Sequence, residues 1–149
     1  MTKKMMTLDY VIGIDPGVNT GFAVWNGNEF EEITATNIIT AIEKLKRYAD
    51  NFNVKVYYED ARLRHWFGSS GREKLMGAGS VRRDSQIWET ACKLLNIPYV
   101  AVAPKDNMTK LNAKMFATYT KWKGRTNEHG RDAAMLVFQR PMKHSDYDD

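Results

Sequence analysis

Short apolar segments separated by turn residues open the chain. Residues 11–14 and 22–25 are almost wholly apolar, which is typical of buried strands. Asn-Gly-Asn at 26–28 predicts a turn, after which residues 29–35 are expected to return as a third strand. Consecutive strands joined by short turns predict a three-stranded antiparallel meander.

A helical period follows the meander. Residues 37–51 are predicted to form an amphipathic helix, because apolar side chains recur at the spacing of one helix face. These side chains are Ile38, Ile42, Leu45, Ala49 and Phe52. Asn37 is of a type that caps helix N-termini. The segment VKVYYE, residues 54–59, then predicts a fourth strand that ends in an acid.

The second half of the chain predicts three helices and one strand. Residues 61–80 are rich in Gly, Ser and Arg and predict a mobile loop that leads into a helix over about 78–96. A strand is expected at 99–103, and helices at about 109–121 and 126–141. Inward positions are expected in the first two helices at Val81, Ile87, Trp88, Ala91, Leu94, Leu95, Leu111, Met115 and Phe116.

The order of these elements, β-β-β-α-β-α-β-α-α, predicts an α/β fold. The meander would join two parallel strands in a mixed five-stranded sheet with helices on both faces. At 149 residues, the chain is expected to form one domain, 1–149, that ends in a polar C-terminal tail at about 141–149.

Composition limits the cellular compartments in which we expect the protein. No segment approaches the roughly 20 consecutive apolar residues that a membrane-spanning helix needs. The start, MTKKMMTLDY, lacks the apolar core of a secretory signal. Cys92 is the single cysteine, cannot form an internal disulfide and is expected to be a small buried apolar residue. We therefore expect a reducing, cytoplasmic location and no membrane association.

Basic residues are concentrated in two blocks. Residues 62–83 and 105–125 each carry six Lys or Arg residues and one acid, whereas the formal net charge of the whole chain is only +4. Two basic blocks on an otherwise acidic chain indicate a surface that binds a polyanion such as nucleic acid. The alternative is that both blocks are ordinary solvated faces.

Acids are placed where the predicted elements end or begin. Asp15 ends the first strand and Glu59 ends the fourth. If the crossover helix is right-handed, these strands are parallel neighbours, and both carboxylates emerge at one edge of the sheet. Asp132 lies near the start of the last helix, and His129, three residues earlier, shares its helix face.

Such a cluster would repel itself unless a cation neutralised it, and carboxylate oxygens are the ligands that Mg²⁺ and Mn²⁺ prefer. Two such ions about 4 Å apart can drive phosphodiester cleavage. Each acid also has a simpler interpretation. Asp15 could be only a turn former, Glu59 a solvated strand end, and Asp132 a favourable charge at a helix N-terminus.

Three segments carry a family resemblance. IGIDPGVNTGFAVW, VYYED and HGRDAAMLV resemble the RuvC family of Holliday-junction resolvases, within the RNase H-like superfamily, over about residues 10–138. The resemblance implies an RNase H-like fold in which Asp15, Glu59 and Asp132 hold two Mg²⁺ or Mn²⁺ ions. His129 stands where many relatives carry an acid and some carry histidine, so it is expected to bind metal or to move protons.

The resemblance also implies the substrate and the assembly. The family works as a homodimer on four-way DNA junctions and nicks two strands symmetrically. The cell would be bacterial, or the host of a phage if a phage encodes the chain. DNA contacts are expected at Arg62, Arg64, Trp66, Phe67, Arg82, Arg83, Lys105, Lys110 and Lys114. Trp66 and Phe67 could instead anchor their loop to the core or to the partner subunit.

Three other functions compete with this one. Actin-like and sugar-kinase ATPases share an Ile-Gly-Ile-Asp strand, but they close two such domains over ATP, for which 149 residues leave no room. Another RNase H-like nuclease, acting on RNA–DNA hybrids or RNA precursors, is the serious rival. A non-catalytic DNA-binding protein on the same scaffold is the third, and the presence of all three acids argues against it.

Overall fold

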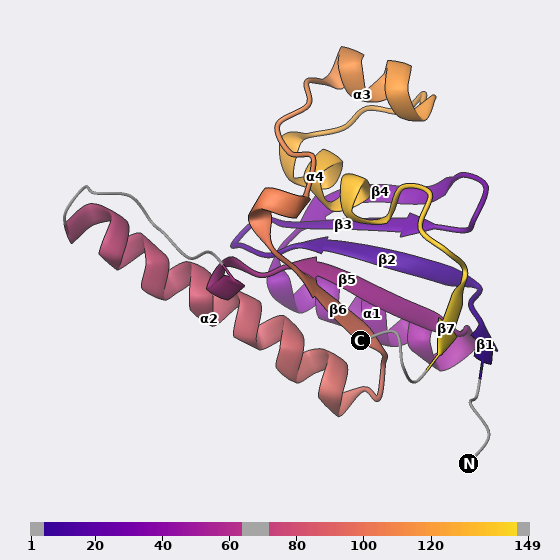
Figure 1. The fold of residues 1–149 in the computed structure, drawn as a ribbon, viewed down its shortest axis with the longest axis horizontal. Coiled ribbons are helices and arrows are strands. Elements are labelled where there is room, and N and C mark those ends of the chain that lie inside the picture. The colour runs from indigo at the N-terminus through magenta and orange to yellow at the C-terminus, as the bar shows by residue number, and fades with distance from the viewer. Residues whose placement is uncertain (1–4, 64–71, 146–149) are drawn as a thin grey trace.

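The computed structural model describes residues 5–63 and 72–145, with only the backbone described at 72–78 and 81. A five-stranded sheet with strand order β4-β3-β2-β5-β6 forms the centre of the molecule (Figure 1). Its strands are β2 (Tyr10–Asp15), β3 (Thr20–Trp25), β4 (Phe30–Thr36), β5 (Val54–Glu59) and β6 (Tyr99–Val102). The first three form the antiparallel meander, and β5 and β6 run parallel to β2, as the sequence predicts.

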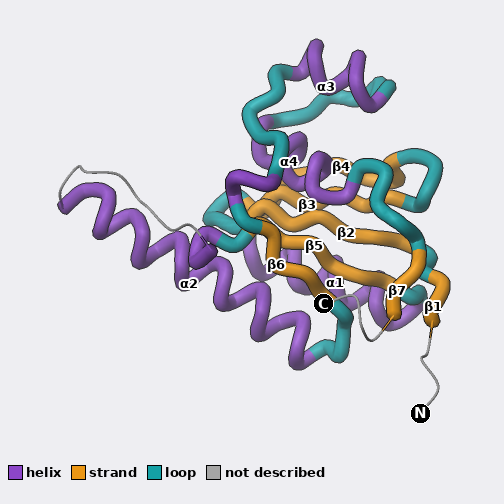
Figure 2. The backbone as a smooth tube through the Cα atoms, viewed as in Figure 1, coloured by secondary structure: helices purple, strands orange, loops and turns teal. Residues whose placement is uncertain are grey.

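Helices cover both faces of the sheet, which confirms the predicted α/β architecture (Figure 2). On one face lie α1 (Ile38–Asn51) and α2 (Arg72–Leu94), and on the other lies α4 (Glu128–Val137). The short helix α3 (Ala113–Thr120) stands beyond α4, away from the sheet (Figure 1). Two 3₁₀ turns, η1 (Ala61–Leu63) and η2 (Pro104–Asp106), follow β5 and β6.

The alternation of side chains along the central strand explains the two layers. In β2, Ile12 and Ile14 point into the core shared with α1 and α2, whereas Val11 points into the core shared with α4. All three are fully buried, so the strand is apolar on both faces. Trp88 and Cys92 extend the first core from α2, and both are fully buried.

Glycines let α4 approach the sheet closely. A Cβ atom at Gly13 in β2 would lie 2.0 Å from the carbonyl oxygen of Ala133, and one at Gly21 in β3 would lie 2.0 Å from that of His129. Any side chain at either position would push the helix away from the strands. The N-terminal turns of α4 are therefore held directly over the ends of β2 and β3. Asn127 caps this helix by accepting a hydrogen bond from the backbone N–H of Gly130 at 2.8 Å.

Several predicted details were wrong. The helix α2 begins at Arg72 rather than near 78, because Arg-Glu-Lys-Leu-Met is a run of strong helix formers. Leu94 was expected to face inward but is 81% exposed at the end of α2. The third helix spans only Ala113–Thr120, and Met115 in it is 54% exposed, because α3 stands off the core and only Phe116 reaches it.

The first and last described segments pair with each other, which the sequence did not indicate. The strand β1 (Met5–Thr7) runs antiparallel to β7 (Lys143–Ser145), with Met6 opposite His144. The part of the expected polar tail at 143–145 is thus a strand, and His144 and Ser145 are buried. Three-residue strands carry too little alternation to be recognised from sequence.

Candidate functional site

Two acids emerge side by side at one edge of the sheet. The parallel register of β2 and β5 pairs Ile14 with Tyr58, and the next residue of each strand is an acid, Asp15 and Glu59. The neighbouring strand β6 pairs Val102 with Glu59. The predicted parallel arrangement of the two strands is therefore confirmed, and it places both carboxyl groups where the chain leaves the sheet.

The helix α4 brings the other two candidate residues to the same edge. His129 Nδ1 lies 3.1 Å from Asp15 Oδ2, across the close contact at Gly21. Asp132 is one turn further along α4, and its Oδ1 accepts a hydrogen bond of 3.0 Å from the backbone N–H of Lys110.

An amide side chain links Glu59 to α4. The Nδ2 group of Asn107 donates to Glu59 Oε2 at 3.2 Å and to the carbonyl oxygen of Asp132 at 3.2 Å. Asp15 is therefore bonded directly to His129, whereas Glu59 is linked to the backbone of Asp132 only through Asn107.

The electrostatics of the site reflect this proximity. Burial raises the pKa of Asp15 from 3.8 to about 7, the hydrogen bond from His129 opposes this rise, and the charges of Glu59 and Asp132 add to it. The pKa of Asp132 is also raised, mainly by burial, while its backbone hydrogen bond from Lys110 lowers it. Asp15 therefore feels both other acids, and part of their mutual repulsion would be relieved by a cation.

The donor set fits a hard divalent cation. Three carboxyl groups and one imidazole in a partly buried position are ligands that Mn²⁺ accepts, and the carboxylates alone suit Mg²⁺. Among residues 5–63 and 72–145, however, no three acid, histidine or cysteine side chains stand close enough to hold one ion. The arrangement is a shared electrostatic site rather than a closed coordination shell, and closing a shell would require rotation of the carboxylate side chains.

No family model matches this sequence, and no curated protein matches it either. A solved structure matches the chain. T. thermophilus RuvC, in complex with a Holliday junction substrate, superposes with a TM-score of 0.51 at 18% sequence identity, covering 87% of this chain and 90% of that chain. The fold is RuvC-like. At this level of identity, the likeness concerns the fold and leaves activity to be argued from the site.

On this RuvC-like fold, the first basic block is only partly available to a ligand. The guanidinium of Arg62 is 2.7 Å from Asp60 and 3.3 Å from Glu89, so binding a phosphate there would have to break ion pairs. Arg82 and Arg83 lie exposed on α2. The remaining predicted contacts of this block lie outside the described residues: Arg64, Trp66 and Phe67.

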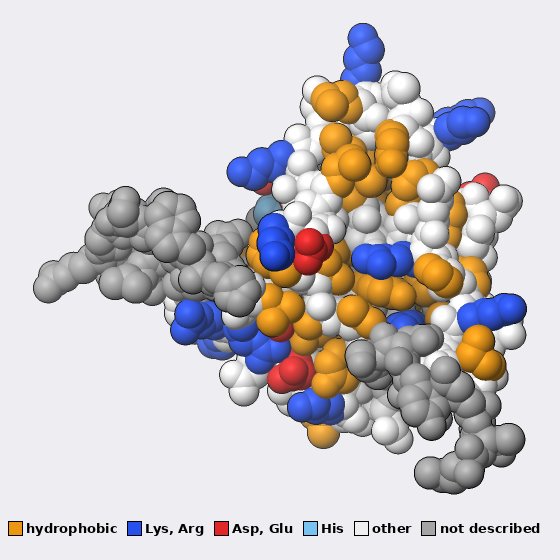
Figure 3. Space-filling view, viewed as in Figure 1, with side chains coloured by type: hydrophobic (Ala, Val, Ile, Leu, Met, Phe, Trp, Pro, Cys, Tyr) orange, Lys and Arg blue, Asp and Glu red, His pale blue; other side chains and the backbone are white. Residues whose placement is uncertain are grey.

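The second basic block stands next to the acids. Lys105 in η2, Lys110 in the following loop and Lys114 in α3 are all exposed, and Lys110 is joined to Asp132 through its backbone. Lys and Arg side chains project from the part of the molecule that carries α3 (Figure 3). Of this block, Lys110 is the lysine whose backbone contacts a candidate acid, and the block continues from there into α3.

Sequence reasoning missed Asn107. Its role depends on the 3₁₀ turn η2, which follows β6 and carries the chain back toward Glu59. A polar residue shortly after a strand end, between two basic residues, was the one available signal. It was not distinctive, because Asn is common in loops.

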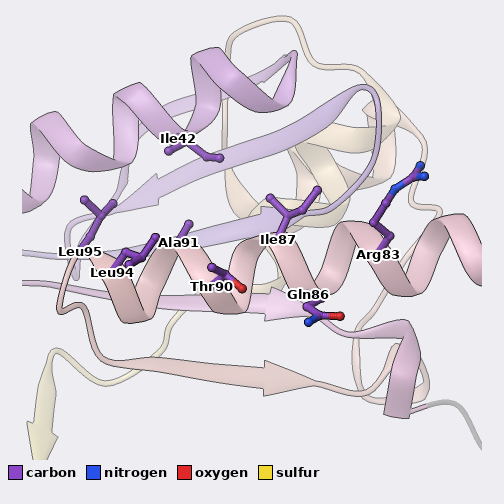
Figure 4. Close-up of a pocket in the computed structure, with 8 residues that line it drawn as sticks. All are labelled: Ile42, Arg83, Gln86, Ile87, Thr90, Ala91, Leu94 and Leu95. Atoms are coloured by element: carbon purple, nitrogen blue, oxygen red, sulfur yellow. The ribbon is translucent and has the colours of Figure 1, made fainter.

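An apolar groove of about 490 Å³ lies between α1 and α2 (Figure 4). Ile42 of α1 lines it from one side, and Ile87 of α2 and Leu95, which follows α2, line it from the other. None of the candidate acids and neither of their bonded partners, His129 and Asn107, lines this groove. Its lining is mainly apolar and holds no acid or histidine, so the site is assigned to the carboxyl-bearing edge of the sheet.

No helix within the described part of the chain is both long and apolar enough to cross a bilayer.

Proposed function

We propose that this protein is a divalent-metal-dependent endodeoxyribonuclease that resolves four-way DNA junctions by symmetric nicking. The observation that carries the proposal is the convergence of Asp15, Glu59, Asp132 and His129 from three separate elements at one edge of a RuvC-like sheet. Burial, and after it the charges of Glu59 and Asp132, raise the pKa of Asp15, and an acid with a perturbed pKa beside other acids is a candidate for a functional site.

The three carboxylates would hold two Mg²⁺ or Mn²⁺ ions, which when bound supply Lewis acidity and a lower pKa for an attacking water. The side chain of Asp15 is 14% exposed, and its carboxyl group contacts His129. A carboxylate next to Nδ1 favours the tautomer that carries its proton there, which leaves Nε2 to accept one. We infer that His129 takes up a proton at Nε2 during hydrolysis.

The basic residues would position the DNA backbone. Lys105, Lys110 and Lys114 are exposed, and the backbone of Lys110 bonds to Asp132, so a phosphate held at Lys110 would stand near the carboxyl groups. A homodimer would place two such sites about a two-fold axis, which matches the two equivalent strands of a four-way junction.

A cleavage assay with matched substrates tests the proposal. Four-way junction, flap, duplex and RNA–DNA hybrid would be incubated with the protein and Mg²⁺ or Mn²⁺, and products mapped at nucleotide resolution. We expect paired, symmetric nicks on the junction and little cutting of the other three. Preferential cutting of the hybrid would favour another RNase H-like nuclease.

The Asp15→Asn variant separates chemistry from binding. It should lose cleavage by a factor of at least about 100 while keeping its affinity for the junction in EDTA, because Asn keeps the shape but not the charge of the ligand. Junction binding by a wild-type protein that cuts none of the four substrates would instead indicate a non-catalytic DNA-binding protein.

A further inference from the structure

The side chain of Asn107 occupies a special place between two of the candidate acids. Asn107 follows the 3₁₀ turn η2. In this turn the N–H of Asp106 donates to the carbonyl oxygen of Ala103 at 2.9 Å, and the N–H of Asn107 donates to that of Pro104 at 3.3 Å. Because β6 ends opposite Glu59, this turn returns the chain over the end of β5.

Both hydrogens of the Asn107 amide are used at the site. One is donated to Glu59 Oε2 and the other to the carbonyl oxygen of Asp132, each at 3.2 Å. Both partners are acceptors, so the orientation of the amide is fixed, since the flipped form would place Oδ1 against two oxygens. The side chain therefore joins the strand-end carboxyl group to the backbone of α4.

The carbonyl oxygen of the Asn107 amide, Oδ1, supports a functional role for this side chain. Oδ1 of Asn107 is buried and has no hydrogen-bond partner among the described residues. Leaving a buried acceptor unsatisfied is unfavourable, and an apolar side chain of the same size would avoid this cost. What Asn supplies at this position is thus its two donors.

The loop that carries Asn107 is fixed to α4 at its far end as well. Lys110 has a left-handed backbone, with φ of 64°, and in this conformation its N–H donates to Asp132 Oδ1 at 3.0 Å. Arg131 then donates through Nε to the carbonyl oxygen of Leu111 at 2.7 Å. A left-handed conformation at a residue other than Gly is unfavourable and persists where surrounding contacts impose it.

We propose that Asn107 is a positioning residue that holds the Glu59 carboxyl group at a set place relative to Asp132. The inference rests on the proposed metal-dependent function, because its consequence is that an arriving ion meets a Glu59 carboxyl group already restrained by a hydrogen bond. Residues that orient metal ligands commonly contribute tenfold or more to metal affinity. Asn107 itself acts through Glu59 rather than on the DNA.

The test compares two substitutions that remove the donors in different ways. Asn107→Ala removes the whole amide, and Asn107→Leu keeps nearly the same volume without any donor. Binding of Mn²⁺ to the DNA-free protein would be measured by titration calorimetry at one pH. Both variants should bind Mn²⁺ about tenfold more weakly than the wild type, and both should keep wild-type junction affinity in EDTA.

Asn112→Ala is the matched control. Asn112 caps α3 by accepting from the N–H of Met115 at 2.8 Å and bonds to none of the acids. Its loss should lower the melting temperature without changing Mn²⁺ affinity. Wild-type Mn²⁺ affinity in both Asn107 variants would overturn the proposal. Weakening in Asn107→Ala alone would overturn it too, since packing rather than hydrogen bonding would then be responsible.

A second readout is independent of the proposed function. In the ion-free protein, the side-chain NH₂ resonances of Asn107 should shift when Glu59 is replaced by Gln, because the charged acceptor is lost. Unchanged resonances would refute the Asn107–Glu59 bond itself. If these resonances shift but the wild-type protein binds no Mn²⁺ that depends on Asp15, the metal-dependent function is wrong while the bond stands.

Discussion

His129 Nδ1 lies 3.1 Å from Asp15 Oδ2, although 114 residues separate the two positions in the chain. This contact joins the start of α4 to the end of β2 at the point where Gly21 lets the helix approach the sheet. It partly offsets the rise in the pKa of Asp15 caused by burial.

The raised pKa of Asp15 predicts an unusual pH dependence of stability. Its folded value of about 7 exceeds its ordinary value of 3.8, so the folded state binds the proton more tightly than the unfolded state. The stabilisation is complete below about pH 4 and is lost as the pH rises through 7. Asn carries no charge at any pH, so Asp15→Asn should gain in melting temperature relative to the wild type as the pH rises.

The measurement is thermal unfolding of both proteins in EDTA between pH 4 and 8. The difference between the two melting temperatures should grow by roughly 5 °C across this range. A difference that stays constant, or that shrinks toward pH 8, would show that the Asp15 carboxyl group is not held in the crowded environment described above.

The second basic block predicts a defined salt dependence of DNA binding. Replacing both Lys110 and Lys114 by Ala should weaken junction binding in EDTA and reduce the slope of log K against log salt by about 1 to 2, since each phosphate contact contributes roughly 0.9. The control is the double variant Lys46→Ala and Lys93→Ala, which removes the same charge from exposed positions on α1 and α2. Equal slopes for the two double variants would mean that the block acts only through net charge.

The close contact at Gly21 predicts that a side chain at this position would destabilise the packing of α4 on β3. Gly21→Ala would place a Cβ atom 2.0 Å from the carbonyl oxygen of His129, so α4 must move away from β3. We expect a loss of about 1–3 kcal/mol in the free energy of unfolding by urea. Gly79→Ala is the control, because its Cβ would meet nothing within 4 Å and should be neutral or stabilising by up to about 1 kcal/mol. A Gly21→Ala variant as stable as the wild type would contradict the packing.

The sheet could be predicted from the sequence because the composition of its strands differs clearly from that of the flanking turns. The apolar run before Asp15 and the segment that ends at Glu59 both have the length and composition of buried strands, and the intervening helix fixes them as parallel neighbours. Exposure on short helices was harder to predict. Met115 lies at helical spacing from other apolar residues, but α3 buries only Phe116, so spacing alone did not reveal which side chain faces solvent.

The positions of Asp15 and Glu59 were predictable for the same reason as the strands, since both stand at strand ends, and Asp132 follows from the predicted start of the last helix. The contacts between them were not. Asn107 reaches Glu59 only because η2 turns the chain back, and the Lys110 N–H reaches Asp132 only because its backbone is left-handed. Such contacts depend on the dihedral angles of a few loop residues, which leave no periodic signal in the sequence.

The central claim is that Asp15, Glu59 and Asp132 jointly hold divalent ions. Anomalous diffraction from crystals soaked in Mn²⁺ tests it most directly, because the peaks locate the ions without reference to activity. We expect peaks within bonding distance of carboxylate oxygens from all three residues. Well-occupied Mn²⁺ peaks elsewhere in the molecule, with none at this edge of the sheet, would contradict it.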